Sequence, residues 1–538
     1  MEPTGTRPTR PTRRTPRAEH LPRTPRTSRA RRRRGALFAL TAAAGLLLTA
    51  CSAGGSADGS AADKRALPAP APAPGERYSG SAAPTPGDSH LSTFALDVDT
   101  ASYTYARRTL ADGRVPDPST VRPEEFVNSF RQDYRRPDGN GFSVSVDGAR
   151  TTRPDWSLVR VGLATRDADP DGRRPPAALT FVIDVSGSMD EPGRLDLAKR
   201  SLDTMTDRLR DDDSVAVVTF STRARTVLPM TRLGGHRGEI HDAVDGLRAL
   251  TSTNLGAGVE TGYDTAVEGL REGATNRVVL ISDALANTGE TRPDAILRRI
   301  DSARREHGIT LFGVGVGSDY GDALMERLAD KGDGHTAYVS DTAEARRVFC
   351  VQLPQNIGLT ARDAKAQVAF DPETVAEFRL VGYDDRAVAD DDFRDDRVDG
   401  GEVGPGHTVT ALYAVRTRPG ADGHLATATV RWLDPATRAP HERSGALETG
   451  ALRDSVRAAS PRFQVTAVAA YFADALRAAG TDHGPTLPGA PSLTRLAGRA
   501  AALAEATEDK DVQALADAIR QADDTGRMGG TDTGETLE

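Results

Sequence analysis

The sequence predicts an α/β protein in which a doubly wound, mostly parallel sheet domain is inserted in a β-sandwich, with helical N-terminal and C-terminal parts. Over residues 178–352, near-continuous apolar runs alternate with amphipathic stretches, which is typical of a parallel sheet covered by helices on both faces. Alternating apolar and polar residues over 141–177 and 353–450 predict sandwich strands on both sides of that domain. Helix-period patterns occupy 91–140 and 451–523.

The first 90 residues are predicted to lie outside the fold. Residues 1–50 join an arginine-rich leader to an apolar run that is short for a membrane span, the order of a secretory signal. The tetrapeptide Leu48-Thr49-Ala50-Cys51 resembles a bacterial lipobox, in which the cysteine carries lipid; a signal anchor with an incidental cysteine is the alternative. Residues 51–90, rich in Gly, Ala, Ser and Pro, predict a disordered tether. We therefore expect a lipid anchor at Cys51, on the extracytoplasmic face of the cell membrane, reached by Sec or twin-arginine export.

The charge of the chain argues against nucleic acid as a partner. Residues 1–50 hold twelve Arg and two Glu, so removing this +10 takes the formal net charge from −8 to about −18. An acidic body repels a phosphate backbone, and we expect no nucleic-acid binding. Cys51 and Cys350 are the two cysteines, so lipidation of Cys51 would leave Cys350 without a partner and the fold without a disulfide.

Between residues 91 and 177 the sequence predicts helices over 100–110 and 123–130, then strands over 142–148 and 156–166. Asp97, Asp99 and Ser102 precede or begin the first helix and superficially resemble a metal motif, but their spacing differs from one. We expect Asp99 to cap that helix, with Ser102 in its first turn.

The central region has the strand–helix–strand rhythm of a doubly wound domain. Its strand candidates are LTFVIDV, SVAVVTF, RTVLPM, RVVLISD, TLFGVGV and HTAYVS. Helices are predicted between them over about 195–209, 238–250, 255–271, 293–306 and 321–330. Sites in open α/β sheets form at the carboxyl ends of strands where the strand order reverses, so functional side chains are expected at that edge.

Strands return after the central region, in AKAQVAF, EFRLVGY, HTVTALYAV and HLATATVRW, and we expect them to complete the sandwich. The acidic run over 384–402 lacks EF-hand spacing and predicts a solvated loop, with Ca2+ binding as the alternative. Ser460 is the predicted N-cap of a C-terminal helix with Pro461 at its first position. Further helix follows, before a disordered tail over 524–538.

Polar side chains follow the first central strand at every second position. Asp184, Ser186 and Ser188 come directly after an apolar run. Thr253, just before a predicted helix, and Asp283, at the end of RVVLISD, can join them at the same edge of the sheet. Carboxylate and hydroxyl oxygens are hard ligands that suit Mg2+. Ser and Asp after a strand are also good helix caps, which is the competing interpretation.

These five positions resemble the metal-ion-dependent adhesion site of the von Willebrand factor type A domain, whose pattern is D-x-S-x-S, then a threonine, then an aspartate. The resemblance implies that Ser186 and Ser188 bind the ion directly, while Asp184, Thr253 and Asp283 bind it directly or through water. The implied ion is Mg2+, with Mn2+ or Ca2+ as alternatives.

The resemblance extends beyond the site and has small departures. STFALDVDTASYTYARR, VRPEEFVNSFR, YGDALMERLADKG and GGEVGPGHTVTALYAV are similar to a bacterial subgroup of these proteins, often lipoproteins, with its own N-terminal segment and a C-terminal domain of unknown function. Many family members have Gly-Gly where this chain has Thr251-Ser252, and Gly where it has Ala284. Neither change removes a ligand.

The resulting hypothesis is a membrane-anchored, Mg2+-dependent binding module. Ligands that are mostly neutral hydroxyls leave the ion incompletely neutralised, so an Asp or Glu of a protein partner would complete its coordination. We expect no enzyme, because His335 and His407 lack ligand or base spacing and are interpreted as structural, and no nucleophile elbow or phosphate loop is present. A metal-dependent envelope hydrolase and a structural envelope scaffold are the alternatives.

Overall fold

The computed structural model describes residues 90–167, 174–283, 293–317, 322–332, 334–398, 400–479 and 486–529. The predicted secretory signal, Cys51, nearly all of the tether and Ala284 lie outside these ranges. Within them, no helix combines the length and apolar character needed to cross a membrane.

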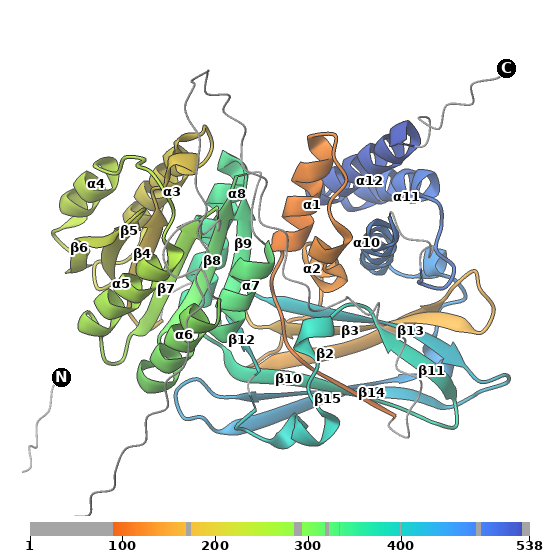
Figure 1. Ribbon diagram of the computed structural model, residues 1–538. Coiled ribbons are helices and arrows are strands. Elements are labelled where there is room, and N and C mark those ends of the chain that lie inside the picture. The colour runs from red at the N-terminus through yellow and green to blue at the C-terminus, as the bar shows by residue number, and fades with distance from the viewer. Residues whose placement is uncertain are drawn as a thin grey trace, which may run out of the picture. The chain divides into compact units, whose positions relative to one another are not determined.

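The central domain is built on a six-stranded sheet with the order β6-β5-β4-β7-β8-β9 (Figure 1). All neighbouring pairs are parallel except β5 with β6. Its strands are β4 (Ala177–Asp184), β5 (Ser214–Phe220), β6 (Ala224–Arg232), β7 (Thr275–Ser282), β8 (Thr310–Val316) and β9 (His335–Val339). Its helices are α3 (Leu195–Arg208), α4 (Arg237–Asp245), α5 (Leu255–Glu268), α6 (Pro293–His307), α7 (Asp322–Lys331), α8 (Thr342–Arg347) and α9 (Leu353–Ile357).

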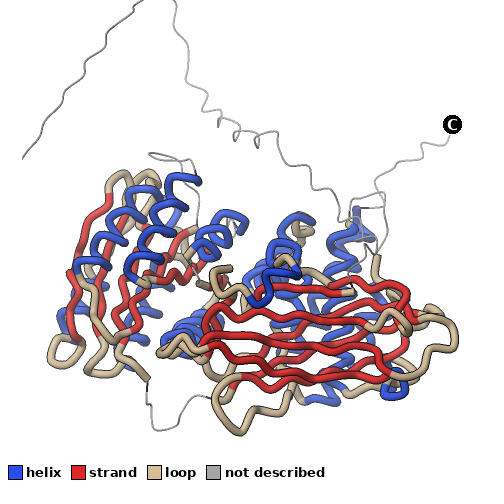
Figure 2. Tube along the Cα trace, turned by 90° about the horizontal axis from the view of Figure 1, so that it is seen from below, coloured by secondary structure: helices blue, strands red, loops and turns tan. Residues whose placement is uncertain are grey.

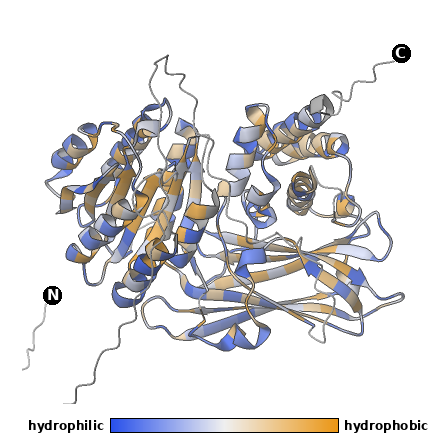
Figure 3. Cartoon of the chain, in the orientation of Figure 1, coloured by the Kyte–Doolittle hydropathy of each residue, from blue (hydrophilic) through white to orange (hydrophobic). Residues whose placement is uncertain are grey.

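Helices cover both faces of this sheet because successive strand residues point to opposite sides. Phe181 and Ile183 of β4 belong to the core that includes α3 and α4, whereas Val182 belongs to the core that includes α5, α6 and α7. Figure 3 shows the consequence, with largely hydrophobic strands between helices whose outer faces are hydrophilic. The predicted doubly wound fold is confirmed.

The strand order reverses at β4. After β4 the chain passes to β5 on one side, and it later returns to β7 on the other side of β4. The helices that follow β4 and β7 therefore leave the sheet in different directions, and the carboxyl ends of these two strands flank a switch point. Asp184 is the last residue of β4, and Asp283 directly follows β7.

Two antiparallel sheets form the predicted sandwich, with the central domain inserted between β3 and β10 (Figures 1 and 2). They share one apolar core, to which Phe94, Val161, Val368 and Tyr413 contribute. One sheet comprises β1 (Leu91–Ala95), β10 (Ala361–Phe370), β12 (Gly401–Val403), β14 (His424–Leu433) and β15 (Pro440–Glu448). The other comprises β2 (Phe142–Arg150), β3 (Trp156–Thr165), β11 (Val375–Leu380) and β13 (Thr408–Thr417).

Helices from both ends of the chain form one further core. They are α1 (Ala101–Ala111), α2 (Pro123–Asn128), α10 (Pro461–Ala478), α11 (Leu493–Thr507) and α12 (Lys510–Gly529). Their apolar side chains pack with Leu158 of β3 and Leu412 of β13. Ser460 caps α10 as predicted, since its hydroxyl accepts from the backbone N–H of Phe463.

Four local expectations were wrong. Residues 91–95 form a strand of the sandwich instead of beginning a helical segment, because Phe94 is fully buried in the sandwich core. The acidic run over 384–402 is only partly solvated, since Glu402 lies buried in β12. Helix α12 continues to Gly529, into the predicted tail.

The fourth concerns the start of α1. Thr100 occupies the N-cap position without a side-chain cap, and the Asp99 carboxylate accepts instead from the backbone N–H and the hydroxyl of Thr336, at 3.0 and 3.1 Å. Ser102 donates its hydroxyl to the carbonyl of Thr120 at 2.6 Å. Asp99 therefore bonds to β9 and does not cap α1.

A candidate metal centre at the edge of the central sheet

Asp184 is held in one orientation by its neighbours. It is fully buried at the end of β4. Its Oδ1 accepts from the backbone N–H of Ser186 at 2.8 Å, and its Oδ2 accepts from the hydroxyl of Ser282 at 2.7 Å. Burial, with a smaller contribution from the charge of Asp283, raises the pKa of Asp184 to about 6. A nearby cation would reverse this effect by favouring the carboxylate.

The two serines present their hydroxyls together. The turn over Gly187–Asp190 brings Ser186 Oγ and Ser188 Oγ into a hydrogen bond of 3.0 Å with each other. Two ligands at right angles around an ion, each about 2.1 Å from it, would lie about 3.0 Å apart. Ser186 is buried and Ser188 half-buried, so the pair lies at the boundary between the protein interior and solvent.

Thr253 lies in a loop that is hydrogen-bonded to the residues just after β4 and β5. On one side, Leu250 N–H donates to the carbonyl of Val185 at 2.6 Å. On the other, Asn254 N–H donates to Ser221, one residue beyond β5, at 2.7 Å, and the Asn254 side chain caps α5. Thr253 itself is buried. The loop therefore holds a threonine hydroxyl beside the carboxyl ends of β4 and β5.

Asp283 carries the clearest sign of a missing partner. Its Oδ2 accepts from Arg194 Nη1 at 3.1 Å, and the same nitrogen donates to the carbonyl of Ser188 at 3.1 Å. Arg194 thus connects Asp283 to the serine turn. Asp283 Oδ1 is buried and has no hydrogen-bond partner among the described residues. Leaving a buried charged oxygen unsatisfied costs about 1–3 kcal/mol or more, which a bound cation would remove.

The donor set fits a hard divalent cation. It comprises two carboxylates and three hydroxyls, from Asp184, Asp283, Ser186, Ser188 and Thr253. Oxygen ligands of this kind suit Mg2+, Mn2+ or Ca2+. Counting the buried groups alone, the two carboxylates and Arg194 sum to −1 before an ion binds and to +1 afterwards; Arg194 also pairs with the exposed Glu191 at 2.8 Å. Such a centre would attract an anionic group from outside.

Comparison with known proteins places the chain in a family. A sequence model of the von Willebrand factor type A domain matches residues 178–349. The chain is also 34% identical over 411 residues to the uncharacterized protein YfbK of Escherichia coli (strain K12), an alignment that covers 72% of this chain and 71% of YfbK. The chain belongs to the YfbK-related von Willebrand factor type A domain proteins. Models named von Willebrand factor and YfbK C-terminal match residues 76–159 and 356–424.

Other similarities are confined to part of the chain or are remote. Inter-alpha-trypsin inhibitor heavy chain H3 of Rattus norvegicus is 27% identical over 178 residues, which cover 32% of this chain and 20% of the rat protein. A solved von Willebrand factor type A structure from Catenulispora acidiphila is 20% identical, covers 72% of this chain and 91% of its own, and has a TM-score of 0.43.

Two features of the site in this YfbK relative were not foreseen from the sequence. Arg194 was not singled out, although its place just before α3 and six residues after Ser188 put it within reach of the serine turn. Ser252 adopts a left-handed backbone with φ of +48°, at a position where many family members have glycine. The change from glycine noted in the sequence therefore places a serine in a backbone conformation that glycine adopts with less strain.

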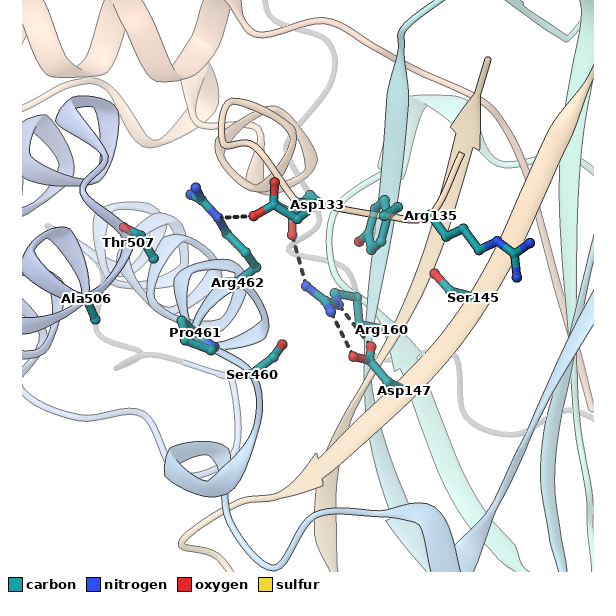
Figure 4. Close-up of a pocket in the computed structure, with 12 residues that line it drawn as sticks. Asp133, Arg135, Ser145, Asp147, Arg160, Ser460, Pro461, Arg462, Ala506 and Thr507 are labelled. Carbon is teal, nitrogen blue, oxygen red and sulfur yellow. Dashed lines mark hydrogen bonds and ion pairs between the residues drawn. The ribbon is translucent and has the colours of Figure 1, made fainter. Parts of the chain in front are cut away.

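A separate pocket of about 590 Å³ shares no residue with this centre (Figure 4). It lies between the β2–β3 edge of the sandwich and the C-terminal helices, and four of its charged side chains form two ion pairs. Arg160 donates to Asp147 at 2.7 and 2.9 Å and to Gln132 at 3.0 Å, and Arg462 donates to Asp133 at 3.0 Å. We therefore interpret this pocket as part of the structural contact between the sandwich and the C-terminal helices.

Proposed function

We propose that this protein is a membrane-anchored, extracytoplasmic binding module whose Asp184 site holds Mg2+ and uses it to bind an Asp or Glu side chain of a protein partner. The observation that carries the proposal is the buried, unsatisfied Oδ1 of Asp283, whose other carboxylate oxygen is linked through Arg194 to the turn that carries the Ser186 and Ser188 hydroxyls. Mn2+ or Ca2+ are alternative ions for the same ligands. Membership of the von Willebrand factor type A domain proteins supports an interaction role.

The charge of the site supports an acidic group as the partner's contact. Hydroxyl ligands are neutral, and Arg194 already offsets part of the carboxylate charge at Asp283. An ion held there would keep a net positive charge, and a carboxylate is the protein side chain that best completes hard-ion coordination. The half-buried position of Ser188 leaves one side of the site open to such a group.

An exposed leucine at the rim suggests what flanks that acidic residue. Leu250 is 54% exposed, and its backbone carbonyl lies 3.3 Å from where a β-carbon on Gly187 would be. We expect an apolar side chain of the partner, next to its Asp or Glu, to cover Leu250. Leu250→Ser should then weaken partner binding while leaving Mg2+ affinity unchanged.

The decisive experiment is capture of partners from an envelope extract by the purified protein, in Mg2+ and in EDTA. Asp184→Ala and EDTA should each abolish capture, and titration calorimetry should show that Asp184→Ala no longer binds Mg2+. Asp190→Ala is the matched control. Asp190 lies six residues after Asp184, at the end of the same turn, but it is exposed. Capture that persists in EDTA and in Asp184→Ala would reject the proposal. Metal-dependent melting without metal-dependent capture would favour a scaffold.

The anchor is a separate part of the proposal and rests on the Leu48-Thr49-Ala50-Cys51 sequence. Cys51→Ser should move the protein from the membrane fraction to the soluble exported fraction, because the lipid supplies the membrane affinity. A Cys350→Ser variant should stay with the membrane. Retention of Cys51→Ser in the membrane fraction would favour the signal-anchor alternative.

A further inference from the structure

A second cluster of potential ligands lies where the segment before α1 meets strand β9. Asp97 and Asp99 come from that segment, and His335 begins β9. All three side chains are buried. Each can offer one ligand atom, and these atoms all lie within 4.8 Å of one another. The cluster shares no residue with the Asp184 site, and its two contributing segments are far apart along the chain.

The charged groups of this cluster lie near one another but farther apart than in short ion pairs. His335 Nδ1 lies 3.4 Å from Asp99 Oδ1. Arg386 contacts both aspartates, with Nε at 3.5 Å from Asp97 Oδ2 and Nη2 at 3.7 Å from Asp99 Oδ2. Charge-assisted hydrogen bonds between such groups are normally about 2.7–2.9 Å long. At 3.4 Å the contact of His335 with Asp99 is longer than such a bond, so it leaves the ring nitrogen available to another ligand.

His335 gives an independent indication of a ligand. It is only 5% exposed, and neither of its ring nitrogens has a hydrogen-bond partner among the described residues. Burying a polar group without a partner is unfavourable, and a neutral imidazole is a common metal ligand.

The two aspartates are already held in place for such a role. Asp97 Oδ1 accepts from the backbone N–H of Asp99 at 2.9 Å. Asp99 accepts from the backbone N–H and the hydroxyl of Thr336. These bonds fix both carboxylates without using all of their lone pairs. Arg386 is the cation closest to them in this cluster, so two carboxylates face one guanidinium, and the cluster can accept further positive charge.

We propose that Asp97, Asp99 and His335 form a second divalent-cation site that joins the N-terminal segment to β9. Two carboxylates and one imidazole suit Zn2+ or Mn2+ better than Mg2+, because imidazole is a ligand of the softer first-row ions. Zinc would require ligand distances of about 2.0–2.2 Å, so the three ligand atoms would draw together slightly on binding. The ion would cross-link two segments that are far apart in the sequence.

The test measures metal content in the full chain carrying Asp184→Ala, so that the result does not depend on the Asp184 site. After loading with Zn2+ and removal of excess ion, mass spectrometry should find one equivalent per chain. Adding His335→Gln or Asp97→Asn should reduce this to a small fraction. His407→Gln is the matched control and should keep the full equivalent, because His407 is a neighbouring half-buried histidine outside the cluster, with a centroid distance of 6.4 Å to His335.

Folding of each variant is checked by circular dichroism, and the isosteric Asp97→Asn variant decides the matter if His335→Gln does not fold. Co2+ gives a second readout, since its visible absorption should shift on loss of the imidazole ligand. Absence of stoichiometric Zn2+ and Mn2+ in the Asp184→Ala protein would overturn the proposal and assign the space to water. Full metal content in both cluster variants would overturn it as well.

Discussion

Arg194 sets the charge of the proposed metal site. It is buried, and it bonds both Asp283 and the carbonyl of Ser188, so it neutralises the site in part when no ion is bound. The same guanidinium repels an incoming cation. Arg194 therefore stabilises the metal-free protein and lowers its affinity for Mg2+. The two effects can be measured separately.

Arg194→Met should lower the stability of the metal-free protein by about 3 kcal/mol, because it leaves Asp283 as an uncompensated buried charge. It should also raise Mg2+ affinity by about tenfold or more, since one positive charge near the ion is lost. Urea unfolding with and without Mg2+ measures both. Arg200→Met, which removes an exposed pair with Asp196 on α3, should change stability by less than about 1 kcal/mol. Unchanged Mg2+ affinity in Arg194→Met would contradict the assignment.

Asp184 should make Mg2+ binding depend on pH. Its pKa is about 6 in the folded, metal-free protein and near 3.8 in an unfolded chain. A raised carboxyl pKa contributes stability that is fully present below about pH 4 and is lost as pH rises through about 6. The ion needs the carboxylate, so Mg2+ affinity should rise about tenfold per pH unit up to about pH 6 and then level off.

Titration calorimetry between pH 5 and 7.5 checks this dependence. Measuring Mg2+ affinity rather than stability isolates Asp184 from other buried carboxyls, such as Glu124, whose pKa burial raises to about 7. An affinity that stays constant across the range would show that Asp184 is not a ligand.

Helix α5 positions Thr253 through its close approach to the sheet. A β-carbon on Gly262 would lie 2.3 Å from Val182 Cγ2, and one on Gly258 would lie 2.6 Å from Phe220 Cδ1. Glycines four residues apart lie on the same helix face, so α5 contacts β4 and β5 with backbone instead of side chain. The helix begins two residues after Thr253, and its distance from the sheet therefore places that hydroxyl.

Gly262→Ala should destabilise the protein by about 2 kcal/mol, because the added methyl group forces α5 away from Val182. The same displacement should weaken Mg2+ binding. Gly498→Ala in α11 is the control, since no atom lies within 4 Å of the position that its β-carbon would take and alanine favours helix by up to about 1 kcal/mol. Thermal unfolding of both variants measures the difference, and equal effects at the two positions would contradict the close-packing explanation.

The inserted domain and the sandwich are joined by buried charge as well as by the chain. Arg277 of β7 lies 3.5 Å from Glu402 of β12, and both side chains are buried. Arg277 also donates to the hydroxyl of Thr310 at 2.8 Å. Burial raises the pKa of Glu402 and lowers the pKa of Arg277, effects that their opposite charges counteract. This pair should couple the unfolding of the two parts.

Glu402→Ala should destabilise the protein by about 3 kcal/mol, because Arg277 is then left as an unpaired buried charge. It should also separate the unfolding of the central domain from that of the sandwich into two calorimetric transitions. Glu377→Ala, which removes a more exposed pair with Arg416, should cost less than about 1 kcal/mol and keep the wild-type profile. A wild-type profile for Glu402→Ala would show that the apolar contacts alone provide the coupling.

Periodicity by itself determined the architecture of this protein. The run ending at Asp184 is almost continuously apolar because both faces of a parallel sheet are covered. Strand β14 alternates because one face of its sheet lies on the shared core, whereas β3 and β13 are buried on both faces, since the terminal helices cover their other side. Ser460 capped α10 as expected, because capping depends on neighbours within one turn. The spacing of Asp184, Ser186 and Ser188 likewise lies within a single turn, so sequence sufficed to predict their proximity.

Tertiary structure alone decided which distant residues meet. The local pattern favoured Asp99 as a helix cap, yet its carboxylate bonds Thr336, 237 positions away. Arg194 contacts Asp283, and Asp97 lies beside His335, for the same reason. Strand order and helix packing bring these residues together, and neither produces a periodic pattern in the sequence. Local hydrogen bonds depend on spacing along the chain, whereas burial and charge compensation depend on the assembled fold.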